Sequence, residues 1–571
     1  FYIACQEGHI EIVKLLLNDE KIDVNDALNR GATPFYAACQ NGHIDIVKRL
    51  LNDKRVDINK ADNDGTTPLH IVCQNKDIEI LKYILGSGKE VDLTVKDKTG
   101  NTFIDIARNE NEKMVELLES FEKNPNKTRT SLRMGTQFLD ACENGDVEEV
   151  KLLLGDERVE INKADNNGWT PFFIACKNGH IEIVKLLLKR NTVDINKLDT
   201  KGRSPFYIAC LKGHIDIVEL LLNDEKVDIM KAAEDGRTPL QIACENGHTE
   251  IVKLLLLNDQ QSDRNKINDF GDTLFYVACK NGHIGIVKLL LNDERVNINQ
   301  ANKNSETPFY VACVNRHFEI VKLLLNDKRV VDINQATEEG STPFFITCGL
   351  EYFDIVQLLL NDERIDVNKE DRWSKTPFYV ACEEGQIEIV ELLLNNQRVD
   401  INQVDDLNRT PFFIACKNRY VEIVKLLLSN DRVDVNKASD GITPFYAACY
   451  SGHHDIVKLL LNSNRISINI TNNDGWTPFD IACLKEHIDI VKLLLTNKGV
   501  NINNANDEGA TPFYFACQEG HTEIVEILLN DKRTSLWKKT KGGKTAFDIA
   551  KINNYSDIAK LIKESDTGNH H

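Results

Sequence analysis

A phrase of thirty-four residues recurs along almost the whole chain, and this period limits the fold more than any other feature of the sequence. One copy at residues 474–483, DGWTPFDIAC, returns at residues 508–517 as EGATPFYFAC. All fifteen cysteines fall on one column of the repeat, at Cys5, Cys39, Cys73, Cys142, Cys176, Cys210, Cys244, Cys279, Cys313, Cys348, Cys382, Cys416, Cys449, Cys483 and Cys517. Arg108 and Lys551 occupy the same column in two further copies, which makes seventeen units. Such a period predicts one supersecondary unit stacked many times, each unit burying its apolar face against its neighbours.

The copy at residues 167–200 predicts the structure of one unit. Thr170 is a good helix N-cap and Pro171 suits the first helical position, so a first helix begins there. Gly179 supplies the left-handed conformation that ends this helix. After this turn, apolar residues at 3.6-residue spacing predict a second helix with one buried face. Residues 193–202 are extended and rich in turn formers, so the unit is helix, turn, helix and hairpin-like loop.

This unit resembles the ankyrin repeat, whose pattern runs Asp-x-x-Gly-x-Thr-Pro-Leu-His-x-Ala-Ala-x-x-Gly-His. Residues 67–70, Thr-Pro-Leu-His, reproduce the tetrapeptide of that family, and the resemblance covers nearly the whole chain. The chain departs from the pattern where Phe-Tyr or Phe-Phe replaces Leu-His and Ala-Cys replaces Ala-Ala. The loop after the second helix is one residue longer and, as in residues 290–299, lacks the Gly that usually ends that helix. The resemblance implies an all-α repeat fold, an ankyrin-repeat α-solenoid of about seventeen helix-turn-helix units with hairpin-like loops.

Composition opposes several classes of partner and environment. The formal charge of −19 disfavours phosphate backbones and anionic lipid, so nucleic acid is not an expected partner. No apolar run approaches the roughly 20 residues that cross a bilayer, so we expect no membrane span. An odd number of cysteines, one per repeat in an apolar run, indicates buried free thiols rather than a disulfide framework. The sequence therefore predicts a reducing compartment, the cytoplasm.

The repetition breaks between residues 120 and 133, which predicts a boundary between two arrays. Polar residues replace apolar ones in the repeats on both sides, as in terminal repeats that lack a neighbour. We expect residues 1–121 to be the end of a first array, 122–131 a linker, 132–565 a second array of about thirteen repeats and 566–571 a tail. A continuous solenoid with one degenerate repeat is the alternative. Because Phe1 lies inside a repeat, whether further repeats or another domain precede it stays open.

The cysteine and histidine columns contain residue types that can bind metals, but their positions in the repeat indicate structural roles. Ten repeats place a histidine four residues after the cysteine, as in Cys176 and His180. Zinc needs four converging ligands, whereas each cysteine belongs to a core stripe and most of the histidines follow a helix-ending Gly. A catalytic triad, a phosphate-binding loop or a pair of catalytic carboxylates would appear as a departure from the repeat, and no departure has the local context of such a site. We therefore expect no enzyme, metal site or cofactor.

Three features predict a partner-binding surface on repeats nine to fourteen. An aromatic residue stands three positions before the cysteine in six consecutive repeats, at Tyr276, Tyr310, Phe345, Tyr379, Phe413 and Tyr446. The Gly-His turn is exchanged in the same region, which adds Arg316, Tyr352, Arg419 and Tyr420, and Trp373 lies in a connecting loop. Binding hot spots are enriched in Trp, Tyr and Arg. A buried aromatic ladder and simple drift of the repeats are the alternatives.

The resemblance implies a non-catalytic scaffold that binds partner proteins through the concave face and loop tips of a solenoid. The acidic charge favours a partner with basic patches. The alternative is a structural protein that self-associates into filaments, because the apolar face of the first repeat, with Ile3, Ile12 and Leu15, needs a cover and head-to-tail contacts need not close.

Overall fold

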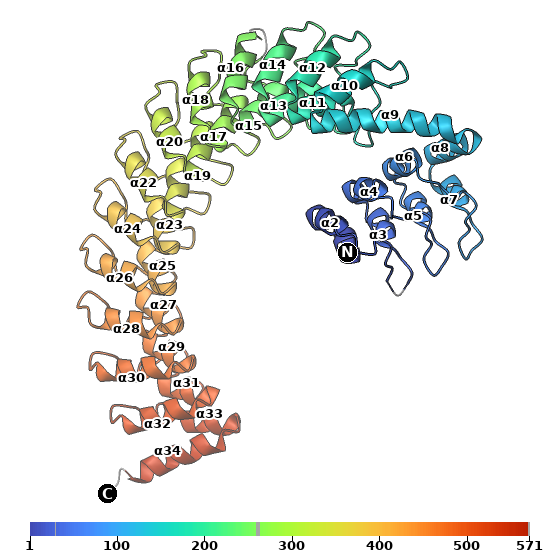
Figure 1. The fold of residues 1–571 in the computed structure, drawn as a ribbon. Helices are drawn as coiled ribbons and strands as arrows, with labels where there is room; N and C mark the ends of the chain where they lie inside the picture. Colours follow the sequence, from blue (N-terminus) through green and yellow to red (C-terminus); the bar gives the residue numbers. More distant parts are fainter. Residues whose placement is uncertain (29, 259–262, 569–571) are drawn as a thin grey trace. The chain divides into compact units, whose positions relative to one another are not determined.

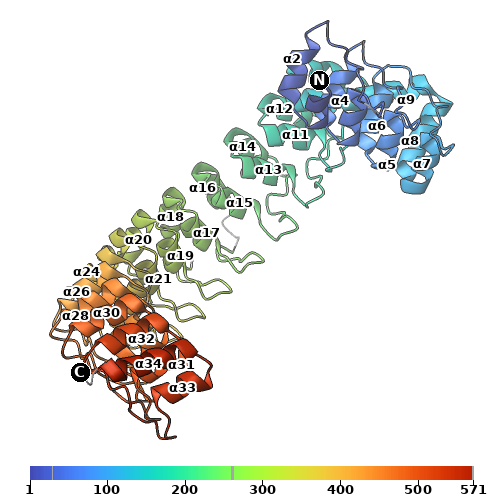
Figure 2. The ribbon, with the colours of Figure 1, turned by 90° about the horizontal axis from the view of Figure 1, so that it is seen from below.

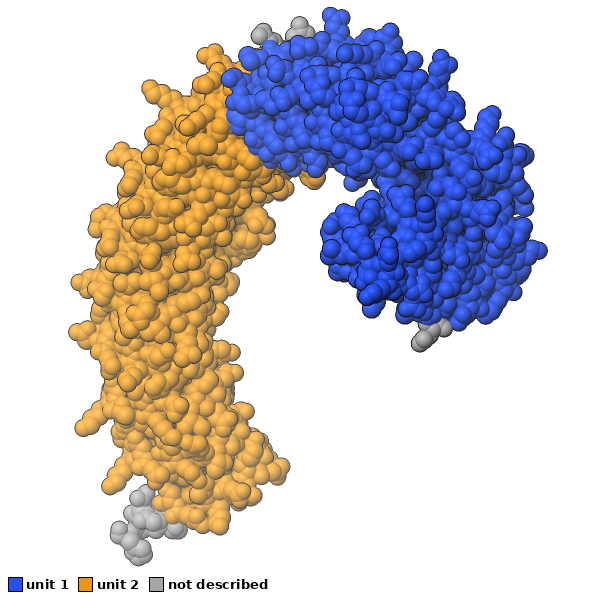
Figure 3. All heavy atoms as spheres, in the orientation of Figure 1, with its two compact units in different colours: residues 1–263 blue, residues 264–571 orange. Residues whose placement is uncertain are grey.

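The computed structural model describes residues 1–28, 30–258 and 263–568, and helices in pairs run through these ranges (Figure 1). No strand occurs among the described residues, where the extended backbone amounts to one isolated bridge between Ser439 and Ile442. The predicted helix-turn-helix repeat is thereby confirmed, with seventeen helix pairs. The chain divides into two compact units, residues 1–263 and 264–571 (Figure 3), and each is described by itself.

The first unit contains eight helix pairs. Their first helices are α1 (Tyr2–Gln6), α3 (Pro34–Gln40), α5 (Pro68–Gln74), α7 (Phe103–Glu110), α9 (Pro125–Asn144), α11 (Pro171–Asn178), α13 (Pro205–Lys212) and α15 (Pro239–Glu245). Their second helices are α2 (Ile10–Leu17), α4 (Ile44–Leu51), α6 (Ile78–Gly86), α8 (Glu112–Lys123), α10 (Val147–Leu154), α12 (Ile181–Leu188), α14 (Ile215–Leu222) and α16 (Thr249–Asn258).

The second unit contains nine helix pairs. Their first helices are α17 (Leu274–Lys280), α19 (Pro308–Val314), α21 (Pro343–Gly349), α23 (Pro377–Glu383), α25 (Pro411–Lys417), α27 (Pro444–Tyr450), α29 (Pro478–Leu484), α31 (Pro512–Glu519) and α33 (Ala546–Ile552). Their second helices are α18 (Ile284–Leu291), α20 (Phe318–Leu325), α22 (Phe353–Leu360), α24 (Ile387–Leu394), α26 (Val421–Leu428), α28 (His454–Leu461), α30 (Ile488–Thr496), α32 (Thr522–Asn530) and α34 (Ser556–Gly568).

Local sequence explains where the helices begin and end. The Thr170 hydroxyl accepts a hydrogen bond from the Phe173 N–H, and Pro171 occupies the first helical position, as predicted. Gly179 ends α11 in the left-handed conformation, with φ of 81°. The same threonine cap recurs at most first helices, so each unit sets the start of its own helix pair without help from its neighbours.

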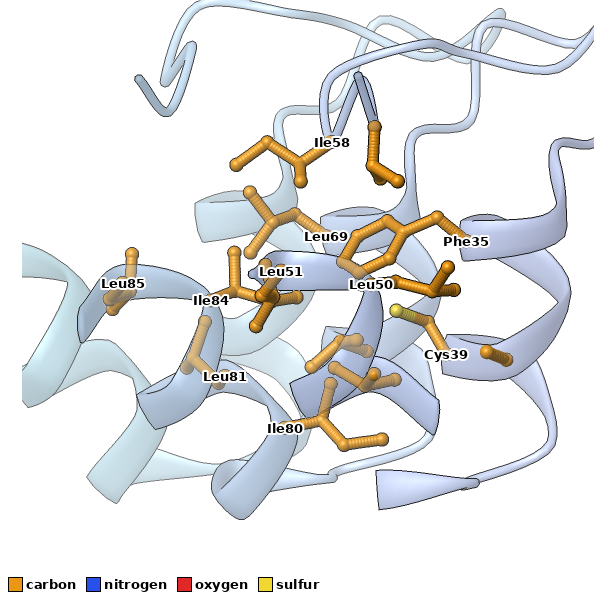
Figure 4. Close-up of a cluster of buried hydrophobic side chains, with 14 of the residues drawn as sticks. Phe35, Cys39, Leu50, Leu51, Ile58, Leu69, Ile80, Leu81, Ile84 and Leu85 are labelled. Carbon is orange, nitrogen blue, oxygen red and sulfur yellow. The ribbon is translucent and has the colours of Figure 1, made fainter. Parts of the chain in front are cut away.

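The core is a ladder of small and apolar side chains between the helix pairs. First helices pack against the first helices of neighbouring repeats, and each pair packs internally. All fifteen cysteines are buried and free, which confirms that part of the sequence prediction. In Figure 4, Cys39 of α3 lies in a cluster of buried side chains with Phe35 and Leu50. Burial raises the pKa of the Cys73 and Cys142 thiols to about 12, so these sulfur atoms are neutral packing groups at neutral pH.

An asparagine ladder joins the loops that follow the second helices. Asn368 Nδ2 donates to the Arg398 carbonyl at 2.8 Å, and Asn368 Oδ1 accepts from the Asp400 N–H at 2.8 Å. The same two bonds recur at Asn25, Asn59, Asn162, Asn196, Asn265, Asn299, Asn334, Asn402, Asn436, Asn469 and Asn503. The longer loop of the thirty-four-residue repeat therefore works as a clamp between adjacent units.

An arginine of the following repeat replaces the missing helix-ending glycine. α18 ends without a left-handed residue, because its C-cap Asn292 has φ of −80°. Arg329 instead donates to the carbonyl of Leu291, the last residue of α18, at 2.7 Å. Arg364 and Arg465 do the same for Leu325 and Leu428. Orphan carbonyls at these helix ends are thus satisfied from the next unit.

Residues 122–131, where a linker was predicted, are mostly helical. α8 ends at Lys123, Asn124 caps α9, and α9 continues for 20 residues through the repeat that follows. Its N-terminal half packs against α6 and α8, which lie beside it in Figures 1 and 2, and Leu132 belongs to the core of the first four repeats. The compact first unit therefore includes both sides of this segment, and the division into two arrays stays a prediction.

Candidate protein-binding surface

The aromatic column of repeats nine to fourteen is buried. Tyr276, Tyr310, Phe345, Tyr379, Phe413 and Tyr446 are each at most 7% exposed. They stand at the third position of the first helices, where their rings pack between neighbouring repeats. The structure thus favours the buried ladder over direct contact with a partner for these six residues.

Two of these tyrosine hydroxyls are bonded to the hairpin of the next repeat. Tyr379 donates to Asp405 Oδ2 at 2.9 Å, and Tyr276 donates to Glu306 Oε2 at 2.8 Å. Burial, and then the neighbouring carboxylate, raise the pKa of both phenols, which stay protonated. Each of these two hydroxyls therefore fixes a hairpin to the preceding first helix and is already hydrogen-bonded within the chain.

Sequence reasoning missed the charged partner of this network. Arg409 donates from Nε to Asp405 Oδ2 at 2.7 Å, so Asp405 accepts from both Tyr379 and Arg409. Asp199 and Arg203 form the same pair at 2.8 Å. The signal in the sequence is an Asp at the start of the hairpin with an Arg four residues later, a spacing that recurs only in these copies of the hairpin turn.

The exchanged turns keep the left-handed backbone. Arg316 has φ of 57° and Arg419 has φ of 65°, close to the region that glycine occupies elsewhere. In regular repeats the histidine after the glycine donates from Nε2 to a carbonyl of the preceding repeat, as His214 does to Lys177 at 3.0 Å. Gln386 replaces that bond by donating to the Gly349 carbonyl at 2.9 Å. The histidine column is therefore a structural ladder.

Both exchanged arginines contact the next repeat. Arg316 lies 3.5 Å from Asp354 and its guanidinium is 5.4 Å from the Tyr352 ring centroid. Arg419 lies 3.2 Å from Asp455. Such exposed pairs contribute up to about 1 kcal/mol, which is comparable with the roughly 1 kcal/mol cost of the left-handed conformation. Stacking alone thus accounts for the positions of these arginines, while their side chains stay more than half exposed.

Trp373 is the most exposed aromatic side chain among the predicted residues. It is 39% exposed in the hairpin before α23, with the Arg372 guanidinium 4.3 Å from its ring centroid. Trp169 and Trp476 directly precede the capping threonine, whereas Trp373 stands three residues before it. Trp476 stacks on Phe515 at 4.2 Å, and Trp169 packs near Phe173 at 6.0 Å. Trp537, in the loop after α32, is 44% exposed. A flat ring paired with a guanidinium is an anchor of the kind that binding hot spots use.

The predicted residues form two edges rather than one patch. Trp373 lies before the N-terminus of α23, whereas Tyr352, Arg419 and Tyr420 lie in turns after the C-termini of first helices. A first helix of seven residues separates the two edges by about 10 Å. We call Trp373 with its hairpin the hairpin edge, and the turn residues the turn edge.

Among the described residues, no group of three or more His, Cys, Asp or Glu side chains is arranged to hold a metal ion. Nor does any helix of that part of the chain have the length and apolar character to span a membrane.

Comparison with known families agrees with the geometry. The model of the ankyrin repeats, which describes three copies at a time, matches in overlapping segments at residues 1–97, 54–131, 138–232, 193–265, 225–302, 256–337, 294–371, 327–405, 344–439, 412–506 and 498–570. The chain belongs to the ankyrin-repeat family. No curated protein matches the chain as a relative. Ankyrin repeats are generally modules of protein–protein interaction and typically non-catalytic, which confirms the coarse function predicted from the sequence.

Proposed function

We propose that the protein is a non-catalytic scaffold of the cytoplasm that binds partner proteins through the edges of repeats nine to fourteen. The observation that carries this proposal is Trp373, an exposed indole in a repeat family whose loops recognise proteins. The equivalent position of repeat seven is occupied by Lys201, so the repeat itself does not require an aromatic ring there. The net charge of −19 favours a partner surface with basic patches.

A photo-crosslinking experiment tests the proposal. A benzophenone amino acid is placed at position 373 or at Lys201, the equivalent hairpin position of repeat seven, and captured proteins are purified and titrated against the unmodified chain. We expect capture at position 373 and an affinity that falls at least tenfold with Trp373→Ala, since hot spots contribute about 2 kcal/mol or more.

Turn-edge variants extend the same titration. Tyr352→Ala and Arg419→Ala are expected to weaken binding, whereas His214→Ala, at the position equivalent to Tyr352 in repeat seven, is expected to leave it unchanged. Equal losses in both sets, with folding intact by circular dichroism, would mean that binding is spread along the repeats.

Self-association is a second candidate, favoured by the exposure of Ile3 and Leu15 at 70% and 72% in the first repeat. A second copy of this chain, stacked head to tail, would cover such a face. Sedimentation velocity over a hundredfold concentration range tests it, with Leu15→Glu as the variant that should abolish any association. A constant sedimentation coefficient across that range would exclude self-assembly.

A further inference from the structure

A cavity of about 310 Å³ lies inside the first unit where the first four repeats meet α9. Its walls come from α4, α6, the C-terminal part of α9, the hairpin at residues 165–169 and α11. We call it the junction cavity, and the lining residues that matter here are Asp45, Lys48, Tyr83, Asp140, Glu143 and Trp169. It is separate from the two edges of the second unit described above.

The lining of the junction cavity is strongly acidic. Six carboxylates line it, from Asp45, Asp140 and Glu143 and from Asp77, Glu79 and Asp165. Lys48 is the only cationic residue of the lining. Lys48 is held by Asp140 at 2.7 Å, and Tyr83 also donates to Asp140 at 3.0 Å. Glu143 lies 3.9 Å from Lys48 and its side chain is half exposed. Glu79 is paired with Lys82, which lies outside the lining, so together with the pair of Lys48 and Asp140 the lining keeps a net negative charge on its four other acids.

Two of the carboxylates are open to an incoming cation. Asp45 is exposed on the first turn of α4 and forms no ion pair within the described part of the chain. Glu143 is exposed in the last turn of α9, where its charge also opposes the dipole at the C-terminal end of the helix. A ligand cation that enters the cavity would pair with these exposed acids.

The aromatic walls already attract cations. Lys48 Nζ lies 4.6 Å from the Tyr83 ring centroid, and Lys177 Nζ lies 3.8 Å from that of Trp169. The indole Nε1 of Trp169 is buried and has no hydrogen-bond partner among the described residues. A buried unpaired donor costs about 1–3 kcal/mol, so this wall is not optimised for stability alone. A backbone carbonyl beside a bound cation is the acceptor that such a donor fits.

We propose that the junction cavity binds a lysine or arginine side chain of a partner polypeptide. The inference rests on the proposed protein-binding function and names the chemistry of one partner segment. A volume near 300 Å³ is at the small end of ligand pockets, which suits one long side chain rather than a folded surface. Carboxylates supply the charge, and the rings supply a cation–π wall.

The test uses a heptapeptide, acetylated and amidated at its ends, in which lysine and arginine alternate with serine. It is titrated into the whole chain by calorimetry. The salt concentration is about 150 mM, because screening then suppresses loosely attracted cations. The double change Asp45→Asn with Glu143→Gln is compared with Asp489→Asn with Glu519→Gln. Asp489 stands at the same helix position in repeat fifteen, so both doubles remove two exposed charges. Trp169→Ala is compared with Trp476→Ala, at the same hairpin position, and thermal unfolding checks the fold of each variant.

We expect the peptide affinity to fall at least tenfold in the two cavity variants and less than twofold in their matched controls. Equal losses in cavity and control variants, or no binding of the peptide, would overturn the inference. Full competition by spermidine at equal concentration would also overturn it, because the cavity would then take a free polyamine. Capture through position 373 is measured separately, so failure of the junction cavity leaves the test of the proposed function intact.

Discussion

The junction around α9 and the regular run from α17 to α28 bury similar apolar faces by different means. In the regular run, each first helix has seven residues and packs in a row with the first helices of its neighbours. At the junction, α9 has 20 residues, and its N-terminal half packs against the second helices α6 and α8. The asparagine ladder also stops there, because Thr94 takes the position of the asparagine and bonds within its own loop to Asp92. At this junction the stacking partner changes along one lengthened helix, α9.

The largest expected effect comes from removing the side chain that joins α9 to the first four repeats. Leu132 is 4% exposed, and Leu132→Ala should lower the free energy of unfolding by about 2–5 kcal/mol, as large cavities in cores do. Leu460→Ala in α28 is the matched change in the regular run, where Leu460 is fully buried. Urea unfolding of both variants measures the effect.

Hydrogen exchange then shows where each variant opens. We expect Leu132→Ala to expose amides in residues 1–144 and Leu460→Ala to expose those of α25 to α30. In the unmodified chain, slow exchange at residues 125–131 would support one continuous solenoid, whereas fast exchange there would support two arrays joined by a linker. A loss below about 1 kcal/mol for Leu132→Ala would contradict the packing of α9.

A second prediction concerns a polar residue inside the regular stack. Asp480 occupies the aromatic column, is fully buried, and its Oδ1 lacks a partner among the described residues. Burial raises its pKa from 3.8 to about 6, although hydrogen bonds from Thr477 oppose the rise. The folded chain therefore holds this proton more tightly than the unfolded chain does. The associated stability is fully present below about pH 4 and is lost as the pH rises through about 6.

Asp480→Asn should remove this pH dependence and stabilise the chain at pH 7 by at most about 3 kcal/mol. The measurement is the difference in unfolding free energy between the variant and the unmodified chain at pH 4, 5, 6 and 7. Other carboxylates with lowered pKa, such as Asp293, are common to both proteins and cancel in that difference. A difference that stays constant across the four pH values would contradict the raised pKa.

A third prediction compares a position of the asparagine ladder with Thr94, where the ladder is interrupted. Asn368→Ala removes two hydrogen bonds between adjacent repeats, which should cost about 1–3 kcal/mol. Thr94→Ala changes the equivalent position near the junction, where no bond to the next repeat is lost, and should cost less than about 0.5 kcal/mol. Similar costs for the two variants would show that the ladder adds nothing beyond its own loop.

The smallest expected effect lies in the exchanged turns. Arg419→Gly removes the steric cost of a non-glycine residue in the left-handed conformation, which is about 1 kcal/mol. It also removes one exposed ion pair, which contributes up to about 1 kcal/mol to stability. The net change in thermal stability should therefore be within about 1 kcal/mol of zero. A larger loss would mean that Arg419 does more for stacking than its pair with Asp455 indicates.

Much of the fold followed from the sequence because each unit contains its own signals. Thr170, Pro171 and Gly179 set the ends of α11 as expected, and the cysteine column lies in the core. The sequence predicts a linker at residues 122–131 because the repeated phrase is lost there, and the linker stays a prediction. Asn124 and Pro125, an N-cap with a proline at the first helical position, are the start of α9.

The candidate site was harder to predict, because burial in a repeat array depends on the next unit. Tyr379 has the composition of a binding residue, yet its hydroxyl is bonded to Asp405, 26 residues later. The junction cavity depends on residues as far apart as Lys48 and Trp169, which no local pattern connects. Trp373 lies in a connecting loop, as the sequence predicts, and its side chain is 39% exposed.

The asparagine ladder also has a consequence for how the chain reaches its folded state. Its bonds join residues 30 and 32 positions apart, so each clamp can form as soon as two adjacent units exist, and folding can begin at any pair. The bond between Lys48 and Asp140 spans 92 positions. Closing that longer loop costs about 1 kcal/mol more in chain entropy than closing a loop of 30 residues. We therefore expect the regular repeats to fold from neighbour to neighbour, and the contact at α9 to close after the helices on both sides have formed.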